Sequence, residues 1–233
     1  MNRRESAHIP CPGAHARSAR RSRMASAVEA RPRIPRWWWL AAPLVAFVAA
    51  YSLRYVVLGE RAYVPELAAS FGARPALVLV HTLFGPIALV LGLINLLPVH
   101  QPPARPRAHR FVGRVYLAAS MLLGAAGLAL SLHAAGGLVS RLGFLVLALV
   151  TLGAGVIGYR RIRHGDVRRH REWMTRSYAC IFGAVTLRLW LPMLIVAHGG
   201  EFLPAYRWVA WLAWVPNLAF AEWMIRRART RPT

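Results

Sequence analysis

The chain has 233 residues, of which 57% are hydrophobic and only 16% are charged, whereas a soluble domain carries about 25% charged residues. All 30 basic residues are arginines and eight residues are acidic, which gives a net charge of +22. This composition excludes an intrinsically disordered chain, a disulfide-rich scaffold and an ordinary soluble enzyme. The positive charge leaves nucleic acid or a membrane surface as the partner, and the positions of the arginines decide between them.

The first segment, residues 1–36, is rich in arginine, alanine, serine and proline and has no hydrophobic period. We expect it to be a disordered cytoplasmic tail. Met24 offers an alternative start, which would leave residues 1–23 untranslated.

Six apolar stretches follow the tail. They predict transmembrane helices over about 37–58, 75–98, 113–138, 142–160, 167–198 and 207–226. A helix needs roughly 20 apolar residues to cross the hydrocarbon layer of a bilayer. The predicted fold is therefore all-α: an integral membrane six-helix bundle at 37–227, with a short cytoplasmic tail at 228–233.

The arginines are divided unequally between the two sides of this predicted bundle. The N-terminal tail, the loops at 99–114 and 160–176 and the C-terminus carry 24 of the 30 arginines, and the opposite loops carry five. The positive-inside rule then places both termini in the cytoplasm, which an even number of helices also requires. The charge is thus explained by topology, so the lipid bilayer is the expected partner and nucleic acid is not.

Histidines at the predicted helix ends suggest a cofactor site. His109 and His170 open the third and fifth helices, and His81 lies early in the second. Paired histidines in a membrane bundle are typical axial ligands of b-type haem, and nearby arginines can pair with its propionates. The predicted cofactor-binding set is His81, His109, His170, Arg110, Arg114 and Arg176, with His109 and His170 as the iron ligands and haem b or a quinone as the cofactor. The alternative is that these histidines only meet headgroups and water, and the fourth helix has no histidine to pair with His81.

Arg188 is the second signal, because it lies inside the fifth apolar stretch. A charged side chain at such a depth costs ~2.5 kcal/mol or more, and no acidic residue lies deep in any stretch to pair with it. This favours an anionic ligand such as a carboxylate, a propionate or a phosphate. The alternative is hydrogen bonding to Asn217 or to backbone carbonyls. The predicted ligand-binding residues are Arg188, Asn217, Trp173 and Tyr178.

Other polar residues have structural interpretations. We expect Asp166 to cap the fifth helix, and Glu222 to pair with Arg226 or, across helices, with Arg176. Pro216 beside Asn217 is expected to open the backbone of the sixth helix. Five glycines are expected to allow close helix contact: Gly85, Gly92, Gly113, Gly124 and Gly127.

Two motifs resemble those of a known family. His109-Arg110-Phe111-Val112-Gly113-Arg114-Val115-Tyr116 is similar to an HRxxGRxY signature. Gly165-Asp166 followed by His170-Arg171-Glu172-Trp173-Met174-Thr175-Arg176-Ser177-Tyr178-Ala179 is similar to a GD…HRxWMxRxYA signature. Together with His81, Arg188, Asn217 and Glu222, they resemble the bacterial membrane proteins catalogued as domain of unknown function 2306, over about residues 75–227.

The resemblance implies a multi-pass protein of the bacterial inner membrane and no established activity. One departure is Asn95, where the family pattern has a glutamine. Three functions stay open: a haem- or quinone-binding redox protein, a small-anion or proton-coupled carrier that uses Arg188, and a non-catalytic membrane assembly or accessory protein. Whether the protein is an enzyme is left open as well.

Overall fold

The computed structural model describes residues 34–97 and 106–230. Most of the predicted N-terminal tail, the alternative start at Met24, the segment 98–105 and the last three residues lie outside the described part.

Within the described ranges the chain is helical throughout and contains no strand, which confirms the all-α class. The elements in chain order are α2 (Arg36–Leu58), the 3-10 helix η1 (Gly59–Ala62), α3 (Pro65–Gly72), α4 (Pro75–Leu96), α5 (Pro106–Ser131), α6 (Leu138–Arg163), α7 (Val167–Ile181), α8 (Gly183–Ala197), α9 (Phe202–Leu212) and α10 (Val215–Thr230).

Five segments of the described chain are long and apolar enough to cross a membrane: Arg36–Ala62, Pro75–Leu96, Pro106–Ser131, Leu138–Arg163 and Val167–Ala197. The sixth predicted stretch, 207–226, is divided between the shorter helices α9 and α10. The third helix ends at Ser131 instead of 138, and turns lead to Gly136 and Gly137, whose φ angles of 83° and 81° lie outside the helical region. The short helix α3 was not predicted.

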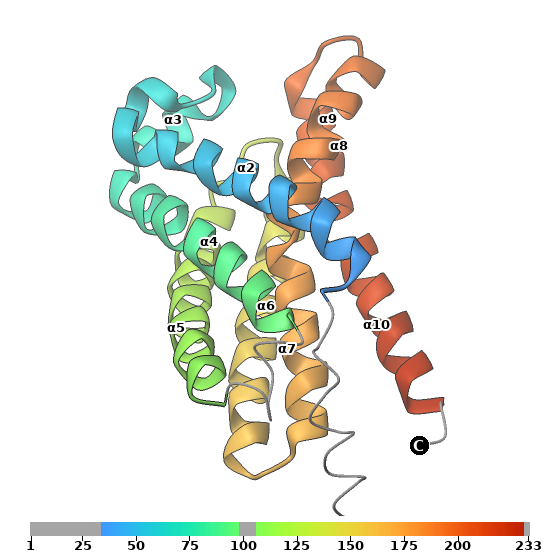
Figure 1. Cartoon of the computed structure of the whole chain (residues 1–233). Coiled ribbons are helices and arrows are strands. Elements are labelled where there is room, and N and C mark those ends of the chain that lie inside the picture. Colours follow the sequence, from blue (N-terminus) through green and yellow to red (C-terminus); the bar gives the residue numbers. More distant parts are fainter. Residues whose placement is uncertain (1–33, 98–105, 231–233) are drawn as a thin grey trace, which may run out of the picture.

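The helices form one bundle with two distinct ends (Figure 1). Helices α4 to α7 pack in chain order, α2 crosses α4 and touches α8, α9 packs on α6 and α8, and α10 packs mainly on α7. The start of α2 and the end of α10 lie toward one end, called here the arginine-rich end because α6 also finishes there with Arg160, Arg161 and Arg163.

The opposite end, called here the α3 end, brings together helix α3, the connection between α5 and α6, and helix α9. The Ser70 hydroxyl donates a hydrogen bond of 2.8 Å to the carbonyl of His133, and Arg207 Nε donates one of 2.9 Å to the carbonyl of Gly136. Helix α3, the connection between α5 and α6, and helix α9 therefore meet at the α3 end.

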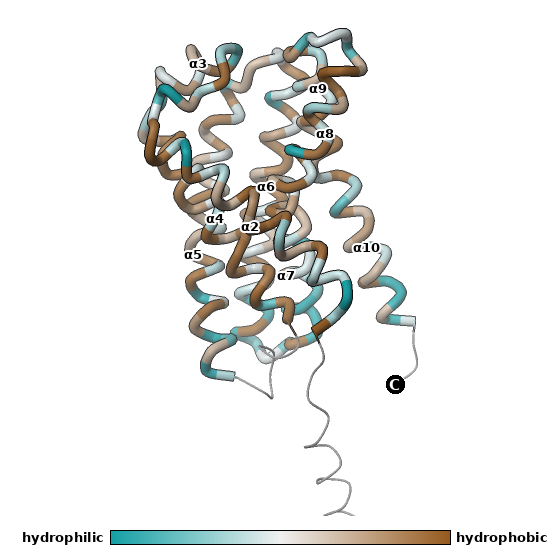
Figure 2. Tube along the Cα trace, turned by 45° about the horizontal axis from the view of Figure 1, so that its top comes forward, coloured by the Kyte–Doolittle hydropathy of each residue, from teal (hydrophilic) through white to brown (hydrophobic). Residues whose placement is uncertain are grey.

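Hydrophobic residues make up much of the helices of the bundle (Figure 2), and many of their large side chains are exposed. On α2, for example, Trp39 is 63% exposed, Leu40 75% and Val57 78%. Soluble monomers rarely expose apolar patches of this extent, whereas lipid covers them at no cost. The surface thus agrees with a membrane location.

Small residues allow the helices to approach closely, as the glycine pattern predicted. Gly92 of α4 faces the rings of Tyr116 on α5 and Tyr178 on α7, both of which are buried. Gly124 of α5 faces Leu152 of α6 in the same way. These contacts fix the spacing of α4, α5, α6 and α7, which form the frame of the bundle.

Two helix interruptions face each other in the middle of the bundle. One is at Phe182, between α7 and α8, and the other is at Ala213–Trp214, between α9 and α10. A Cβ atom placed on Gly183 would lie 3.2 Å from the Ala213 carbonyl oxygen, so the two backbones are in close contact there. Pro216 contributes to the second interruption, because proline lacks the N–H that would bond to the carbonyl of Leu212 four residues earlier.

Candidate functional site

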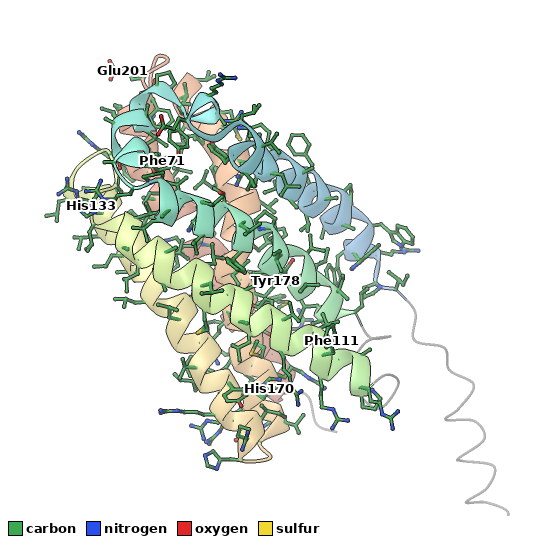
Figure 3. The ribbon with its side chains drawn as sticks, turned by 90° about the vertical axis from the view of Figure 1, so that its left-hand side faces the viewer. Phe71, Phe111, His133, His170, Tyr178 and Glu201 are labelled. Atoms are coloured by element: carbon green, nitrogen blue, oxygen red, sulfur yellow. The ribbon has the colours of Figure 1, made fainter. Side chains whose placement is uncertain are left out.

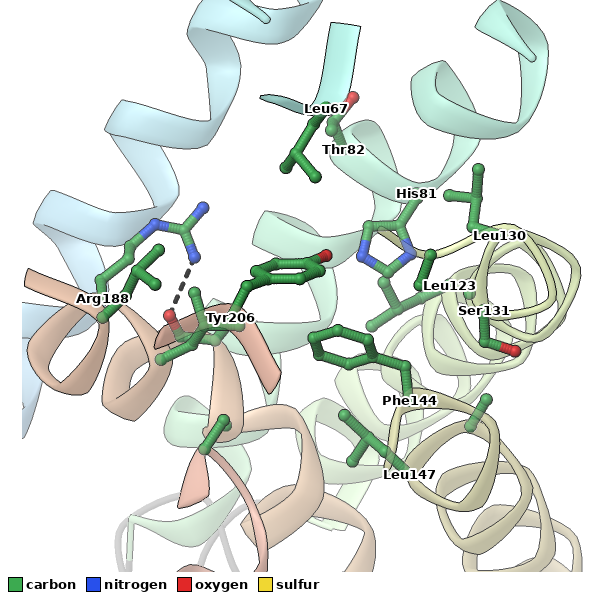
Figure 4. Close-up of a pocket in the computed structure, with 18 of the residues that line it drawn as sticks. Leu67, His81, Thr82, Leu123, Leu130, Ser131, Phe144, Leu147, Arg188 and Tyr206 are labelled. Carbon is green, nitrogen blue, oxygen red and sulfur yellow. Dashed lines mark hydrogen bonds between the residues drawn. The ribbon is translucent and has the colours of Figure 1, made fainter. Parts of the chain in front are cut away.

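A cavity of about 590 Å³ extends from the α3 end into the middle of the bundle. Residues from α2 through α9 line it, and its inner limit includes Gly183 and Ala213, at the two helix interruptions. Most of the wall is apolar or aromatic, with Leu67, Phe144 and Leu147 among the side chains drawn in Figure 4. The volume lies in the range of about 300–1,000 Å³ that is typical of small-molecule sites.

Arg188, one of the predicted ligand-binding residues, lines this cavity. Its Nη1 donates a 2.8 Å hydrogen bond to the carbonyl of Ala184, and its Nη2 donates one of 2.9 Å to the Ser52 hydroxyl on α2. Its Nε is buried and has no hydrogen-bond partner among the described residues. The hydrogen bond to a backbone carbonyl was one expected alternative, but the side-chain partner is Ser52 and not Asn217.

Arg54 supplies a second guanidinium to the cavity. Its Nη2 donates to the Tyr55 hydroxyl at 3.2 Å and to the Ala62 carbonyl at 3.3 Å, and its Cζ lies 4.1 Å from the centroid of the Tyr51 ring. The sequence places Arg54 only among the five arginines on the side of the bundle opposite the cytoplasm, and not in a binding site. The spacing of Tyr51, Arg54 and Tyr55 at i, i+3 and i+4 was the signal that all three share one helix face.

His81, a member of the predicted cofactor set, faces the same cavity from α4. Figure 4 shows its ring pointing toward Tyr206 and Phe144. Nδ1 of the ring is buried and has no hydrogen-bond partner among the described residues. A Cβ atom on Gly127 would lie 3.4 Å from Nδ1, so the absence of a side chain on Gly127 makes room for the imidazole.

The cavity is positively charged. Its lining includes two guanidinium groups and one histidine, and no aspartate or glutamate among the residues that the structure describes. A second, smaller cavity of about 90 Å³ lies next to it and is lined in part by Ser52, His81 and Arg188. Uncompensated positive charge in a mostly apolar space favours an anion, because apolar surroundings screen a charge less than bulk water does.

The other predicted cofactor residues lie at the arginine-rich end. His170 Nδ1 makes a 2.8 Å hydrogen bond to the carbonyl of Gly158 on α6, which ties the start of α7 to the end of α6. His109 is half-buried in the first turn of α5, and Arg110 and Arg114 are exposed on that helix. Figure 3 shows His170 and His133 toward opposite ends of the bundle, with Tyr178 between them. The pairing of His109 with His170 stays a prediction.

Arg176 and Trp173, also predicted site residues, belong to a contact between α7 and α10. Arg176 makes a two-pronged ion pair with Glu222, and its Cζ lies 4.6 Å from the centroid of the Trp173 ring. The predicted cross-helix pairing of Glu222 is therefore confirmed. A second pair joins Glu172 of α7 to Arg229 of α10.

Tyr178 and Asn217 connect helices in the structure. The Tyr178 hydroxyl donates a 3.1 Å hydrogen bond to the carbonyl of Leu89 on α4. Asn217 Nδ2 donates to the Thr186 hydroxyl and to the Ala213 carbonyl, each at 3.0 Å. The sixth predicted helix is interrupted next to Pro216, as expected, and the side chains of Thr186 and Asn217 bind the Ala213 carbonyl at this interruption.

The predicted helix cap is also present, since the Asp166 carboxylate accepts a 3.0 Å hydrogen bond from the backbone N–H of Arg169. The described residues hold no group of three or more histidine, cysteine, aspartate or glutamate side chains arranged to bind a metal ion.

These features define a class: a multi-pass helical membrane protein with a basic cavity inside its helix bundle. The family model described as "Predicted membrane protein (DUF2306)" matches residues 78–225, which is more than half of the chain. The chain belongs to this family, as its motifs predicted. No curated protein and no solved structure matches the chain.

Proposed function

We propose that the protein binds an amphiphilic anion in the cavity at the α3 end and acts as a membrane carrier for it. The observation behind this proposal is that Arg54 and Arg188 line one mostly apolar cavity without any acidic side chain among its described lining residues. In a bilayer, two such charges favour a ligand that brings its own negative charge.

The shape and composition of the cavity indicate an amphiphilic ligand. Arg54 and Arg188 both have an Nε atom without a partner among the described residues, so donors remain for an acidic head group. The walls formed by Leu123, Phe144 and Leu147 suit an apolar body. A fully hydrophilic anion would leave those walls without contacts, whereas a neutral lipid would leave the guanidinium groups without a counter-charge.

The carrier hypothesis also agrees with the depth of the cavity. It reaches the two helix interruptions in the middle of the bundle, and interrupted helices near the bilayer midplane are a recurrent feature of binding sites in transporters. The arginine distribution predicts that the α3 end faces away from the cytoplasm, in the inner membrane of a bacterium.

The test is ligand binding by variants of the arginines, with the protein in nanodiscs of zwitterionic lipid and decanesulfonate as the probe. Arg188→Gln is expected to weaken binding at least tenfold, because a charge-assisted hydrogen bond contributes about 1.5–3 kcal/mol. Arg54→Gln is expected to weaken it in the same direction. Isothermal titration against empty nanodiscs measures both affinities.

The matched control is Arg141→Gln, since Arg141 is exposed at the α3 end and does not line the cavity. Decyltrimethylammonium, which has the same tail and the opposite charge, is expected not to compete. Equal decanesulfonate affinity in the wild type, Arg188→Gln and Arg54→Gln would contradict the proposed anion site.

The haem hypothesis is tested separately. Because Nδ1 of His170 is bound to Gly158, Nε2 is the ring nitrogen left for an iron ligand. If His109 and His170 hold haem, the purified protein shows a Soret band that shifts on reduction with dithionite and disappears in His170→Ala. A flat spectrum of protein from haem-replete cells would exclude haem and leave the cavity as the functional site.

A further inference from the structure

We propose that His81 is a proton-binding site coupled to the anion site, so that the ligand anion and a proton bind together. This inference rests on the proposed function, because it concerns the same cavity. It adds a second bound species, a proton, and assigns it to one atom, Nδ1 of His81.

Nδ1 of the His81 imidazole is buried and has no hydrogen-bond partner among the described residues. When the neutral ring carries its hydrogen on Nε2, Nδ1 carries a lone pair that faces no donor. A buried acceptor without a donor is unfavourable. A proton bound at Nδ1 removes that cost when an anion nearby balances the positive charge of the ring.

The groups around His81 carry positive charge and no negative charge among the described residues of the cavity lining. The titratable or charged groups that share the cavity lining with it come from α2, α7, α8 and α9, and they are Tyr51, Arg54, Tyr55, Cys180, Arg188 and Tyr206. The lining residues from α3, α5 and α6 include no such group. None of these neighbours is a carboxylate, and two are permanent cations. A third positive charge on His81 is therefore opposed until an anion occupies the cavity.

A second cavity beside His81 gives a proton access to the imidazole. The smaller cavity next to the main one is lined by His81, Arg188 and Ser52, and its volume of about 90 Å³ is enough for ordered water at ~30 Å³ per molecule. Water there can hydrogen-bond the imidazole and the Ser52 hydroxyl, which provides a route for the proton from the main cavity. A proton from the bulk solution passes along this water, which is left neutral, to the Nδ1 lone pair, and the ring becomes an imidazolium.

Thermodynamic linkage between proton and anion binding gives the expected direction and size of the pH effect on anion affinity. If an anion favours protonation of His81, then protonation favours binding of the anion by the same factor. The affinity for decanesulfonate, a probe whose own charge does not change in this range, is expected to be at least about fivefold higher near pH 5 than near pH 8. Titrations in buffers of different ionisation enthalpy are expected to show proton uptake on binding.

The decisive variant is His81→Gln, which keeps a polar side chain but cannot titrate near neutral pH. It is expected to bind decanesulfonate with the same affinity at both pH values and without the proton uptake expected for the wild type. The matched control is His133→Gln, since His133 is exposed and does not line the cavity. His133→Gln is expected to keep the pH dependence of the wild type.

The outcomes separate the two proposals. If decanesulfonate binding depends on Arg188 but His81→Gln retains the pH dependence and the proton uptake, the anion site stands and the role of His81 is wrong. If binding does not depend on Arg188 or Arg54 at any pH, the proposed function itself fails. Retained binding by His81→Gln near pH 8 shows that the variant is folded, and should His81→Gln not fold, His81→Asn takes its place.

Discussion

Gly92→Ala is expected to lower the free energy of unfolding by about 3 kcal/mol, although it adds a single methyl group. The added carbon would lie 2.5 Å from Cε2 of Tyr178 and 2.8 Å from Cε2 of Tyr116, distances that real side chains do not adopt. Neither ring can move freely. The hydroxyl of Tyr116 shares a 2.8 Å hydrogen bond with Ser177, and that of Tyr178 is bound to the carbonyl of Leu89.

The matched control is Gly153→Ala. Gly153 also lies inside a helix, α6, but a Cβ atom there would meet nothing within 4 Å. That change is expected to be neutral or to stabilise the protein by about 0.5–1 kcal/mol, because alanine is the better helix former. Reversible unfolding in mixed micelles measures both variants. Similar stability of the two would show that the packing of α4 against the two tyrosines is not tight.

The second prediction with a large effect concerns α10, which is held to α7 by two ion pairs in antiparallel register. Arg176→Gln is expected to destabilise the packing of α10 by about 2 kcal/mol or more, since it leaves the Glu222 carboxylate without its partner at a site that is two-thirds buried. Faster proteolysis at Arg226 and Arg227, which the release of α10 makes more accessible, measures this effect.

Charge reversal tests whether the ion pair between Arg176 and Glu222 is what holds α10 against α7. Arg176→Glu alone is expected to be worse than Arg176→Gln, because it places two carboxylates side by side, and adding Glu222→Arg is expected to restore part of the stability. The control is Arg169→Gln, which removes only the exposed i,i+3 pair with Asp166 and is expected to change stability by less than about 0.5 kcal/mol. If the double variant were no better than Arg176→Glu, the ion pair would not be what holds α10.

The sequence was sufficient for the helical class and for most helix positions, because long apolar stretches bounded by arginines allow few other structures. It did not predict the interruption at Phe182. Nothing in the residues near Phe182 breaks a helix by itself, and the interruption lies where Gly183 meets the backbone of Ala213. A contact between segments so far apart in the chain is not visible as a local pattern.

The candidate site was predictable only in part, because a single unusual residue is visible in the sequence whereas contacts between distant segments are not. Arg188 was found because a charge in an apolar stretch is unusual whatever surrounds it. Its actual partner, Ser52, carries no such signal, since a serine inside a helix ordinarily bonds to its own backbone. Residues such as Arg54 and Tyr206 became candidates only when the fold placed them around one cavity. Tyr178 and Asn217, by contrast, are polar residues whose described hydrogen bonds tie helices together.

The hydrogen bond between Arg188 and Ser52 has a consequence for the synthesis of the protein. Ser52 also donates to the carbonyl of Val48 at 2.8 Å, so α2 can enter the bilayer with its serine already satisfied. Arg188 is not satisfied within α8 alone, because Nη2 depends on a residue 136 positions earlier in the chain. The ribosome makes α2 long before α8, so the acceptor is in the membrane when the arginine arrives. We therefore expect a dependence in one direction only: α2 inserts without α8, whereas α8 reaches its final depth only with α2 beside it.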